Sequence, residues 1–132
     1  MSQLLENINH DIKQVIIIRE DLKNFNISVG KMAVQVAHGA VEGFRLVLRT
    51  NPKIARAWIH QGQKKILLRV PTLAKLIEKY RIADDLNIPA SIIVDAGLTE
   101  LPPNTPTVLV LGPWYADIID KVSGNLPLLK YW

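Results

Sequence analysis

The sequence contains no cysteine among its 132 residues. This absence excludes disulfide bonds, zinc sites built on thiolates and cysteine nucleophiles. The three histidines, His10, His38 and His60, are far apart and lack the spacing of a metal site. No apolar run approaches the roughly 20 residues that a bilayer-spanning helix needs, and the polar first residues lack the apolar centre of a signal peptide. We therefore expect a cytoplasmic protein that uses no metal, cofactor or membrane.

Several sequence motifs of known chemistry are also missing. No G-x-G-x-x-G follows the first apolar run, and no G-x-S-x-G is present. Gly30-Lys31-Met32 is similar to the end of a phosphate-binding P-loop, but Phe25 stands where the first glycine belongs and Met32 replaces the magnesium-binding hydroxyl. These absences leave polar side chains that position a water molecule or bind an anion.

Basic residues are in excess and unevenly distributed. The net charge is +4, and hydrophobic residues make up 48% of the chain, which is ample for one core. Many of the basic residues gather in the first half of the chain, at Arg45, Arg49, Lys53, Arg56, Lys64, Lys65 and Arg69. Such a cluster is typical of a protein with a polyanionic partner.

Four apolar runs predict strands at residues 14–19, 65–70, 91–94 and 107–111. Between them, helix start signals occur at Ser28, at Asn51-Pro52 and at Pro71-Thr72. We expect a long helix at residues 29–49, a short one to residue 60, a third after Thr72, and a last one after Gly112-Pro113. Residues 20–29 read as a polar loop.

The order of these elements predicts an α/β fold. Strands joined by helical crossovers are normally parallel, whereas the third and fourth strands lack a connecting helix and are expected to be antiparallel. The result is a single-domain, three-layer fold with a mixed four-stranded sheet and helices on both faces. We place the domain at residues 14–132, after a short N-terminal extension at residues 1–13. The apolar tail at residues 124–132 would either dock on its own subunit or contribute to an interface.

The long helix carries Lys31, Gln35 and His38 on one face, since side chains three and four residues apart are neighbours. The opposite face, which we expect to be packed, carries Ala33, Ala37, Ala40, Val41 and Phe44. The polar stripe continues through Glu42, Arg45 and Arg49, so periodicity alone also allows a merely solvated face.

The predicted topology brings further polar residues close to this face of the helix. The strands at residues 14–19 and 91–94 would end at the same edge of the sheet, where ligands of open α/β sheets usually bind. Asp95 and Thr99 follow the second of these strands, and Thr107 begins the next one. We therefore expect one crevice lined by Lys31, Gln35, His38, Asp95, Thr99 and Thr107.

Four blocks of sequence stand out together. They are Gln14-Val-Ile-Ile-Ile-Arg-Glu-Asp-Leu-Lys23, Gly30-Lys-Met-Ala-Val-Gln-Val-Ala-His-Gly-Ala40, Asp95-Ala-Gly-Leu-Thr-Glu-Leu-Pro-Pro-Asn-Thr105 and Thr107-Val-Leu-Val-Leu-Gly-Pro113. In their order and spacing, these blocks specifically resemble the type-II peptidyl-tRNA hydrolases. Asn104 stands where many members have glycine, and the loop at residues 24–28 is longer than usual.

The resemblance implies metal-independent hydrolysis of the ester between a peptide and the terminal ribose of tRNA. It implies catalytic roles for Lys31, His38, Asp95, Thr99 and Thr107, and substrate binding by Gln35. With such a substrate, the basic stretch would hold the tRNA phosphates, and we expect Arg45, Arg49 and Lys64 to bind there. Either Asp95 or His38 would act as general base, and Lys31 would bind a phosphate or the developing oxyanion. Without the resemblance, Asp95 also fits a turn cap and Thr107 an ordinary strand residue.

The implied partner is the acceptor end of peptidyl-tRNA, and the resemblance also suggests a homodimer. One rival is a catalytically inactive RNA-binding or adaptor protein on the same fold. The sequence speaks against this rival, because no polar site position is replaced by an apolar residue. A second rival, a hydrolase for another ester or amide on RNA, stays open.

Overall fold

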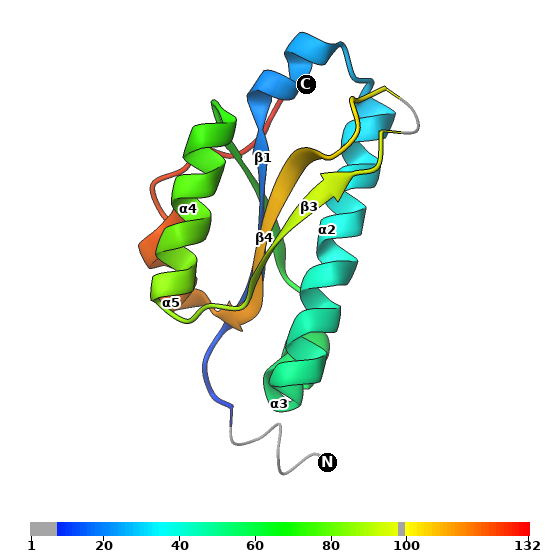
Figure 1. Cartoon of the computed structure of the whole chain (residues 1–132). Helices are drawn as coiled ribbons and strands as arrows, with labels where there is room; N and C mark the ends of the chain where they lie inside the picture. Colours follow the sequence, from blue (N-terminus) through cyan, green and yellow to red (C-terminus); the bar gives the residue numbers. More distant parts are fainter. Residues whose placement is uncertain (1–7, 98–99) are drawn as a thin grey trace.

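A computed structural model describes residues 8–97 and 100–132. Four strands, β1 (Ile12–Arg19), β2 (Lys65–Val70), β3 (Ala90–Asp95) and β4 (Thr105–Tyr115), form one sheet in the order β2-β1-β4-β3 (Figure 1). β1 pairs with β2 in parallel, and β4 is antiparallel to both β1 and β3. The predicted mixed sheet is confirmed.

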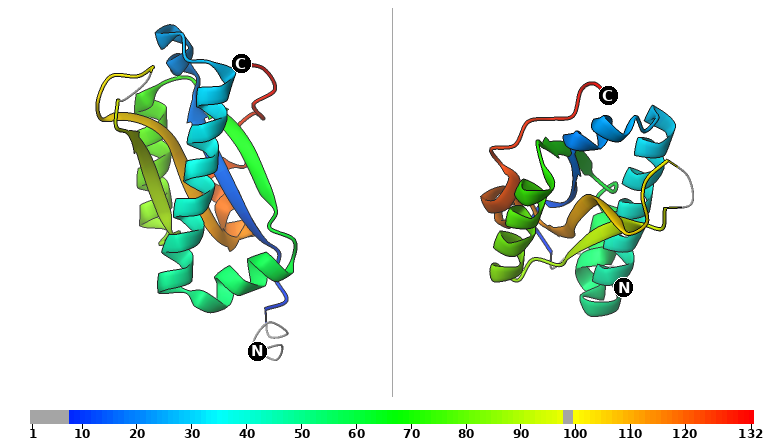
Figure 2. Two further views of the ribbon diagram at one scale, coloured as in Figure 1. Left: turned by 90° about the vertical axis from the view of Figure 1, so that its right-hand side faces the viewer. Right: turned by 45° about the horizontal axis from the view of Figure 1, so that its top comes forward.

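Helices cover both faces of this sheet (Figure 2). The long helix α2 (Val29–Thr50) packs on one face, with α3 (Pro52–His60) at its C-terminal end. The other face is covered by α4 (Leu73–Asp85) and α5 (Ala116–Ser123). The predicted three-layer architecture is therefore also confirmed. None of the helices within the described residues is long and apolar enough to cross a membrane.

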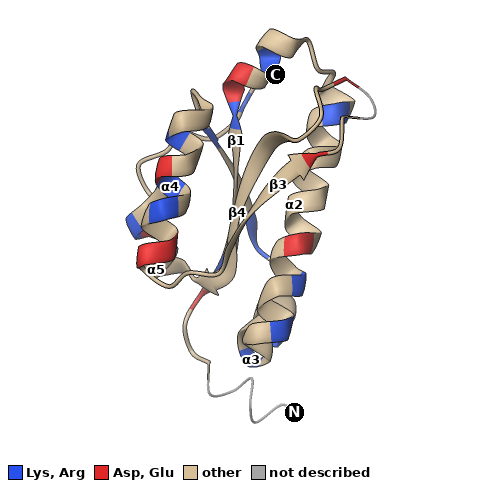
Figure 3. Ribbon diagram, in the orientation of Figure 1, with Lys and Arg blue, Asp and Glu red and all other residues tan. Residues whose placement is uncertain are grey.

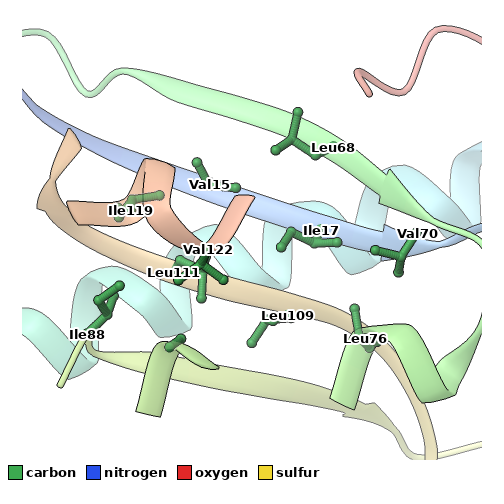
Figure 4. Close-up of a cluster of buried hydrophobic side chains, with 11 residues drawn as sticks. Val15, Ile17, Leu68, Val70, Leu76, Ile88, Leu109, Leu111, Ile119 and Val122 are labelled. Carbon is green, nitrogen blue, oxygen red and sulfur yellow. The ribbon is translucent and has the colours of Figure 1, made fainter. Parts of the chain in front are cut away.

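The central strand β1 is buried over its whole length, because both of its faces are covered. Val15 and Ile17 enter the core beneath α4 and α5, together with Leu109 and Leu111 of β4 (Figure 4). Ile16 and Ile18 point the other way, into the core beneath α2. Alternate side chains of a strand face opposite sides of the sheet, so an unbroken apolar run is what two helical layers require.

Two predicted segments differ from the structure. The expected polar loop contains a short 3-10 helix, η1 (Glu20–Phe25), because Leu22 is fully buried and draws the segment onto the core. β4 runs on through Gly112-Pro113 to Tyr115, where a helix was expected to begin. Pro113 is tolerated there because the β3 ladder ends at Leu111, so that only the β1 side of β4 is still paired.

The predicted packed face of α2 is only partly right. Ala40 and Phe44 pack against the cores as expected, whereas Ala33, Ala37 and Val41 are exposed. The buried positions of the helix are Gln35, Gly39, Gly43 and Val47. The glycines explain the difference, because they let the helix backbone approach β4 closely. A Cβ atom on Gly43 would lie 2.6 Å from the carbonyl oxygen of Gly112. The helix is therefore positioned by its smallest residues and not by its alanine and valine side chains.

The C-terminal tail docks on its own chain. Leu128 forms an antiparallel bridge with Leu68 of β2, and two backbone hydrogen bonds flank it, Arg69 N–H to Pro127 O (3.1 Å) and Leu129 N–H to Leu67 O (3.1 Å). The tail thus covers the outer edge of β2, which would otherwise leave its backbone groups unpaired.

Candidate active site

The start of α2 and the end of β3 meet at the carboxyl edge of the sheet. Ser28 caps the helix, because its Oγ accepts a hydrogen bond from the backbone N–H of Lys31 (3.0 Å). The Ser28 N–H and hydroxyl in turn donate to the carboxylate of Glu100, at 2.8 and 3.1 Å. This cap fixes the first turn of α2, and with it the position from which the Lys31 side chain extends.

An ion pair between Lys31 and Asp95 forms the centre of the site. The Nζ of Lys31 donates to Oδ1 of Asp95 at 2.7 Å, and the two side chains are only 14% and 7% exposed. The same carboxylate oxygen accepts from Nε2 of Gln35 at 3.2 Å, and Oδ2 accepts from the N–H of Gly97 at 2.7 Å. Three donors from two separate segments therefore converge on one carboxylate.

Thr107 holds Gln35 in place from beneath. Its hydroxyl donates to Oε1 of Gln35 at 2.7 Å, so that the amide nitrogen of Gln35 faces Asp95. Thr107 is fully buried and Gln35 is 4% exposed. Both residues were expected to line the crevice, but the structure places them behind Asp95.

Asp95 is ionised at neutral pH. The hydrogen bond from Lys31 lowers the pKa of its carboxyl group below the usual value, burial opposes this shift, and the Gly97 N–H reinforces it. An ionised carboxylate next to an ammonium group and a helix N-terminus is suited to orient a water molecule and to stabilise a developing negative charge.

His38 lies apart from this network. It is exposed on α2, about 10 Å further along the helix axis than Lys31. In the described part of the chain it makes no hydrogen bond to Lys31, Gln35 or Asp95. It borders a shallow hollow with Val34, Ala37, Val41 and Glu42. Thr99, the remaining predicted catalytic residue, lies outside the described residues.

Most of the predicted basic patch lies towards the amino edge of the sheet. Arg45 and Arg49 are exposed on the C-terminal half of α2, where basic positions gather towards α3 (Figure 3). Lys64 precedes β2 at the amino edge and pairs with Asp11 at 3.2 Å. Arg69, in contrast, lies near the carboxyl edge and pairs with Glu20 at 2.7 Å. Arg69 therefore lies apart from Arg45, Arg49 and Lys64.

The site does not favour binding of a metal cation, because the carboxylate of Asp95 is already paired with the ammonium group of Lys31. Within residues 8–97 and 100–132, no group of three or more His, Asp or Glu side chains is arranged to hold a metal ion.

Fold and site together define a small α/β protein with an ion-paired polar site at the carboxyl edge of a mixed sheet. The family model described as peptidyl-tRNA hydrolase PTH2 matches residues 12–129. A peptidyl-tRNA hydrolase of Thermococcus onnurineus is 48% identical over 117 residues, which cover 89% of this chain and 97% of the relative.

More distant relatives show the same likeness. A peptidyl-tRNA hydrolase of Pyrobaculum aerophilum is 43% identical over 91% of this chain and 99% of its own. The human protein named peptidyl-tRNA hydrolase 2, mitochondrial, is 38% identical over 89% of this chain and 64% of its own. The chain belongs to the peptidyl-tRNA hydrolase PTH2 family.

Proposed function

We propose that this protein hydrolyses the ester that joins the carboxyl end of a peptide to the 3′-terminal ribose of a tRNA. The observation that carries the proposal is the Lys31–Asp95 ion pair at the carboxyl edge of the sheet, in a chain 48% identical to a peptidyl-tRNA hydrolase. Gln35 and Thr107 support it, since they hold the carboxylate of Asp95 in one orientation.

In the proposed reaction, a water oxygen attacks the carbonyl carbon of the ester, and Asp95 accepts the proton that the water loses. The ammonium of Lys31 stabilises the negative charge on the former carbonyl oxygen; one such donor contributes about 2.7–4 kcal/mol to catalysis. Collapse of the intermediate breaks the bond to the ribose, and the proton passes to the ribose oxygen. The products are a peptide carboxylic acid, which loses its proton to the solvent, and a tRNA with a free 3′ hydroxyl group.

The ion pair links these two roles. The Lys31 hydrogen bond is the main cause of the lowered pKa of Asp95. It keeps the carboxyl group of Asp95 ionised, which is the form that can accept a proton from water.

Asp95, and not His38, is our choice of general base, because Asp95 contacts Lys31 whereas His38 lies about two helical turns away. The resemblance implies a catalytic role for His38, but because His38 lies apart from the Lys31–Asp95 pair we assign it to substrate binding instead. For Thr99 we keep the role that the resemblance implies, orientation of the water. Gln35 and Thr107 act as positioning residues.

The bound tRNA is proposed to run along α2. At 1.5 Å per residue, Arg45 lies about 21 Å from Lys31 along the helix axis, and Arg49 about 27 Å. Their guanidinium groups would reach acceptor-stem phosphates while the ester lies at Lys31, and Lys64 is the third proposed contact. Contacts with phosphates do not depend on the nucleotide sequence of the RNA, and they weaken as the salt concentration rises.

The substrate assay uses N-acetylated aminoacyl-tRNA and aminoacyl-tRNA with a free amine, both in EDTA. We expect release from the blocked substrate only. Binding without release would instead favour the inactive adaptor, and release that stops in EDTA would contradict metal independence.

A second experiment tests the contacts on α2. Replacing both Arg45 and Arg49 by alanine is expected to raise KM for the tRNA substrate and to make KM less dependent on salt concentration. If the slope of log KM against log salt concentration is unchanged, neither arginine contacts a phosphate.

We further propose that the protein acts in the cytoplasm as a homodimer. The support is the family resemblance together with three exposed apolar side chains of α2, Val34, Val41 and Leu48, which recur every seven residues. Light scattering in solution measures the mass; a mass of one chain at all concentrations contradicts the dimer.

A further inference from the structure

The last residues of the chain are held against the start of α2. The indole N–H of Trp132 donates to the carbonyl oxygen of Ile27 at 3.2 Å, and the Nζ of Lys23 lies 5.4 Å from the centre of the indole ring. Figure 2 shows the C-terminus beside η1. The family match ends at residue 129, so Lys130, Tyr131 and Trp132 lie beyond it.

Two adjoining hollows follow this segment. The first has a volume of about 500 Å³ and is lined by Glu20, Lys23, Arg69, Leu128, Lys130 and Tyr131. The second, of about 430 Å³, is lined by Lys23, Asn26, Ile27, Val29 and Trp132. Lys23 lines both hollows, so they lie next to each other, and together we call them the C-terminal groove.

The C-terminal groove is cationic and carries an exposed aromatic ring. Lys23 and Arg69 both bind the carboxylate of Glu20, at 3.3 and 2.7 Å, and Lys130 adds a third positive charge. Tyr131 is 82% exposed, although large apolar rings normally avoid water. Positive charges that follow a backbone, beside an aromatic ring on which a base stacks, are the usual means of binding single-stranded nucleic acid.

The groove leads to the proposed site. Val29, which lines its second hollow, lies two residues before Lys31, and the preceding Ser28 caps the helix that positions Lys31. A flexible chain that lies in the groove would therefore reach the carboxyl edge of the sheet at the Lys31–Asp95 pair.

We propose that the C-terminal groove binds the single-stranded 3′ end of the tRNA, with Lys23, Arg69 and Lys130 on its phosphates and Tyr131 stacked on a base. This inference rests on the proposed function, because it supplies the part of the substrate next to the ester. The charge of the groove favours RNA over the peptide, whose backbone is neutral. The single-stranded 3′ end joins the acceptor stem to the ester, so the contacts on α2 and those in the groove would both be made by the tRNA side of the substrate.

The test compares Tyr131→Ala, Tyr131→Phe and Lys130→Ala with the control Lys75→Ala, which removes an exposed lysine from α4. Fluorescence anisotropy with labelled, deacylated tRNA gives Kd, and hydrolysis of N-acetylated aminoacyl-tRNA gives KM and kcat. Loss of one stacked base weakens binding by about 5- to 150-fold. We expect Tyr131→Ala to raise Kd and KM within that range with kcat nearly unchanged, and Tyr131→Phe and Lys75→Ala to behave like wild type.

Lys130→Ala is expected to lower the salt slope of binding by about 0.7, the value for one single-strand phosphate contact. Unchanged Kd in both Tyr131→Ala and Lys130→Ala would overturn the inference. An effect that appears only with peptidyl substrates, and not with deacylated tRNA, would also overturn it and assign the groove to the peptide. Failure of wild type to hydrolyse the blocked substrate would instead contradict the proposed function, while the Kd series still tests the groove.

Discussion

Replacing Lys31 by methionine tests the ion pair that organises the site. Methionine keeps most of the length of the lysine side chain but leaves the carboxylate of Asp95, only 7% exposed, without its cation. Removing one partner of a buried ion pair costs about 3–5 kcal/mol. Asp95 retains the donors Gln35 and Gly97, so we expect the free energy of unfolding to fall by about 3 kcal/mol, the lower end of that range.

Urea denaturation followed by tryptophan fluorescence measures this loss, since Trp58 is 2% exposed in the folded state. A double-mutant cycle with Asp95→Asn isolates the pair. In the Lys31→Met background the amide removes an uncompensated charge, so Asp95→Asn should cost little or should stabilise. Equal effects of Asp95→Asn in both backgrounds, within about 0.5 kcal/mol, would refute the argument. The exposed pair Lys75–Glu78 is the control, and Lys75→Met should change stability by less than about 1 kcal/mol.

Three further predictions concern the surroundings of the site. The pKa of Asp95 is lowered in the folded state, so the ionised carboxylate stabilises the fold at neutral pH, and this stabilisation is lost as the pH falls below about 4. The difference in melting temperature between wild type and Asp95→Asn should therefore shrink from pH 6 to pH 3. Gly43→Ala places a Cβ atom 2.6 Å from the carbonyl oxygen of Gly112 and should lower the free energy of unfolding by about 1–3 kcal/mol, measured by urea denaturation. At Gly30 the nearest atom to an added Cβ is 3.8 Å away, so Gly30→Ala should be neutral or stabilising in the same measurement. Ser28→Ala removes the cap of α2 and should cost about 1 kcal/mol by thermal denaturation; no loss would mean that the cap does not hold the first turn.

The strands and their relative directions were predictable because each strand and each connection leaves a local pattern. Unbroken apolar runs indicated burial on both faces, and the connection without a helix between β3 and β4 indicated their antiparallel pairing. That topology correctly predicted that Lys31 and Asp95 meet, although 64 residues separate them in the chain.

The orientation of α2 was not predictable from hydrophobic periodicity. The packed face is defined by Gly39 and Gly43, which count as weak positions in any hydrophobic pattern, and by the polar Gln35. Their burial depends on how closely the helix approaches β4, which is a tertiary property. The same cause separates His38 from the buried network, because it lies on the exposed side of the helix. Glycines spaced by four residues were the available indication of a close helix–sheet contact.

The most direct test of the account is the rate at which Asp95→Asn releases the peptide mimic from N-acetylated aminoacyl-tRNA. Asp120→Asn is the matched control, since it makes the same chemical change at a carboxylate that pairs with Lys13 outside the site. General-base catalysis contributes about 10²–10⁴-fold, so kcat should fall at least about 100-fold in Asp95→Asn and stay near wild type in Asp120→Asn. A folded Asp95→Asn protein that retains wild-type kcat would contradict the assignment of Asp95 as the base and, with it, the proposed mechanism.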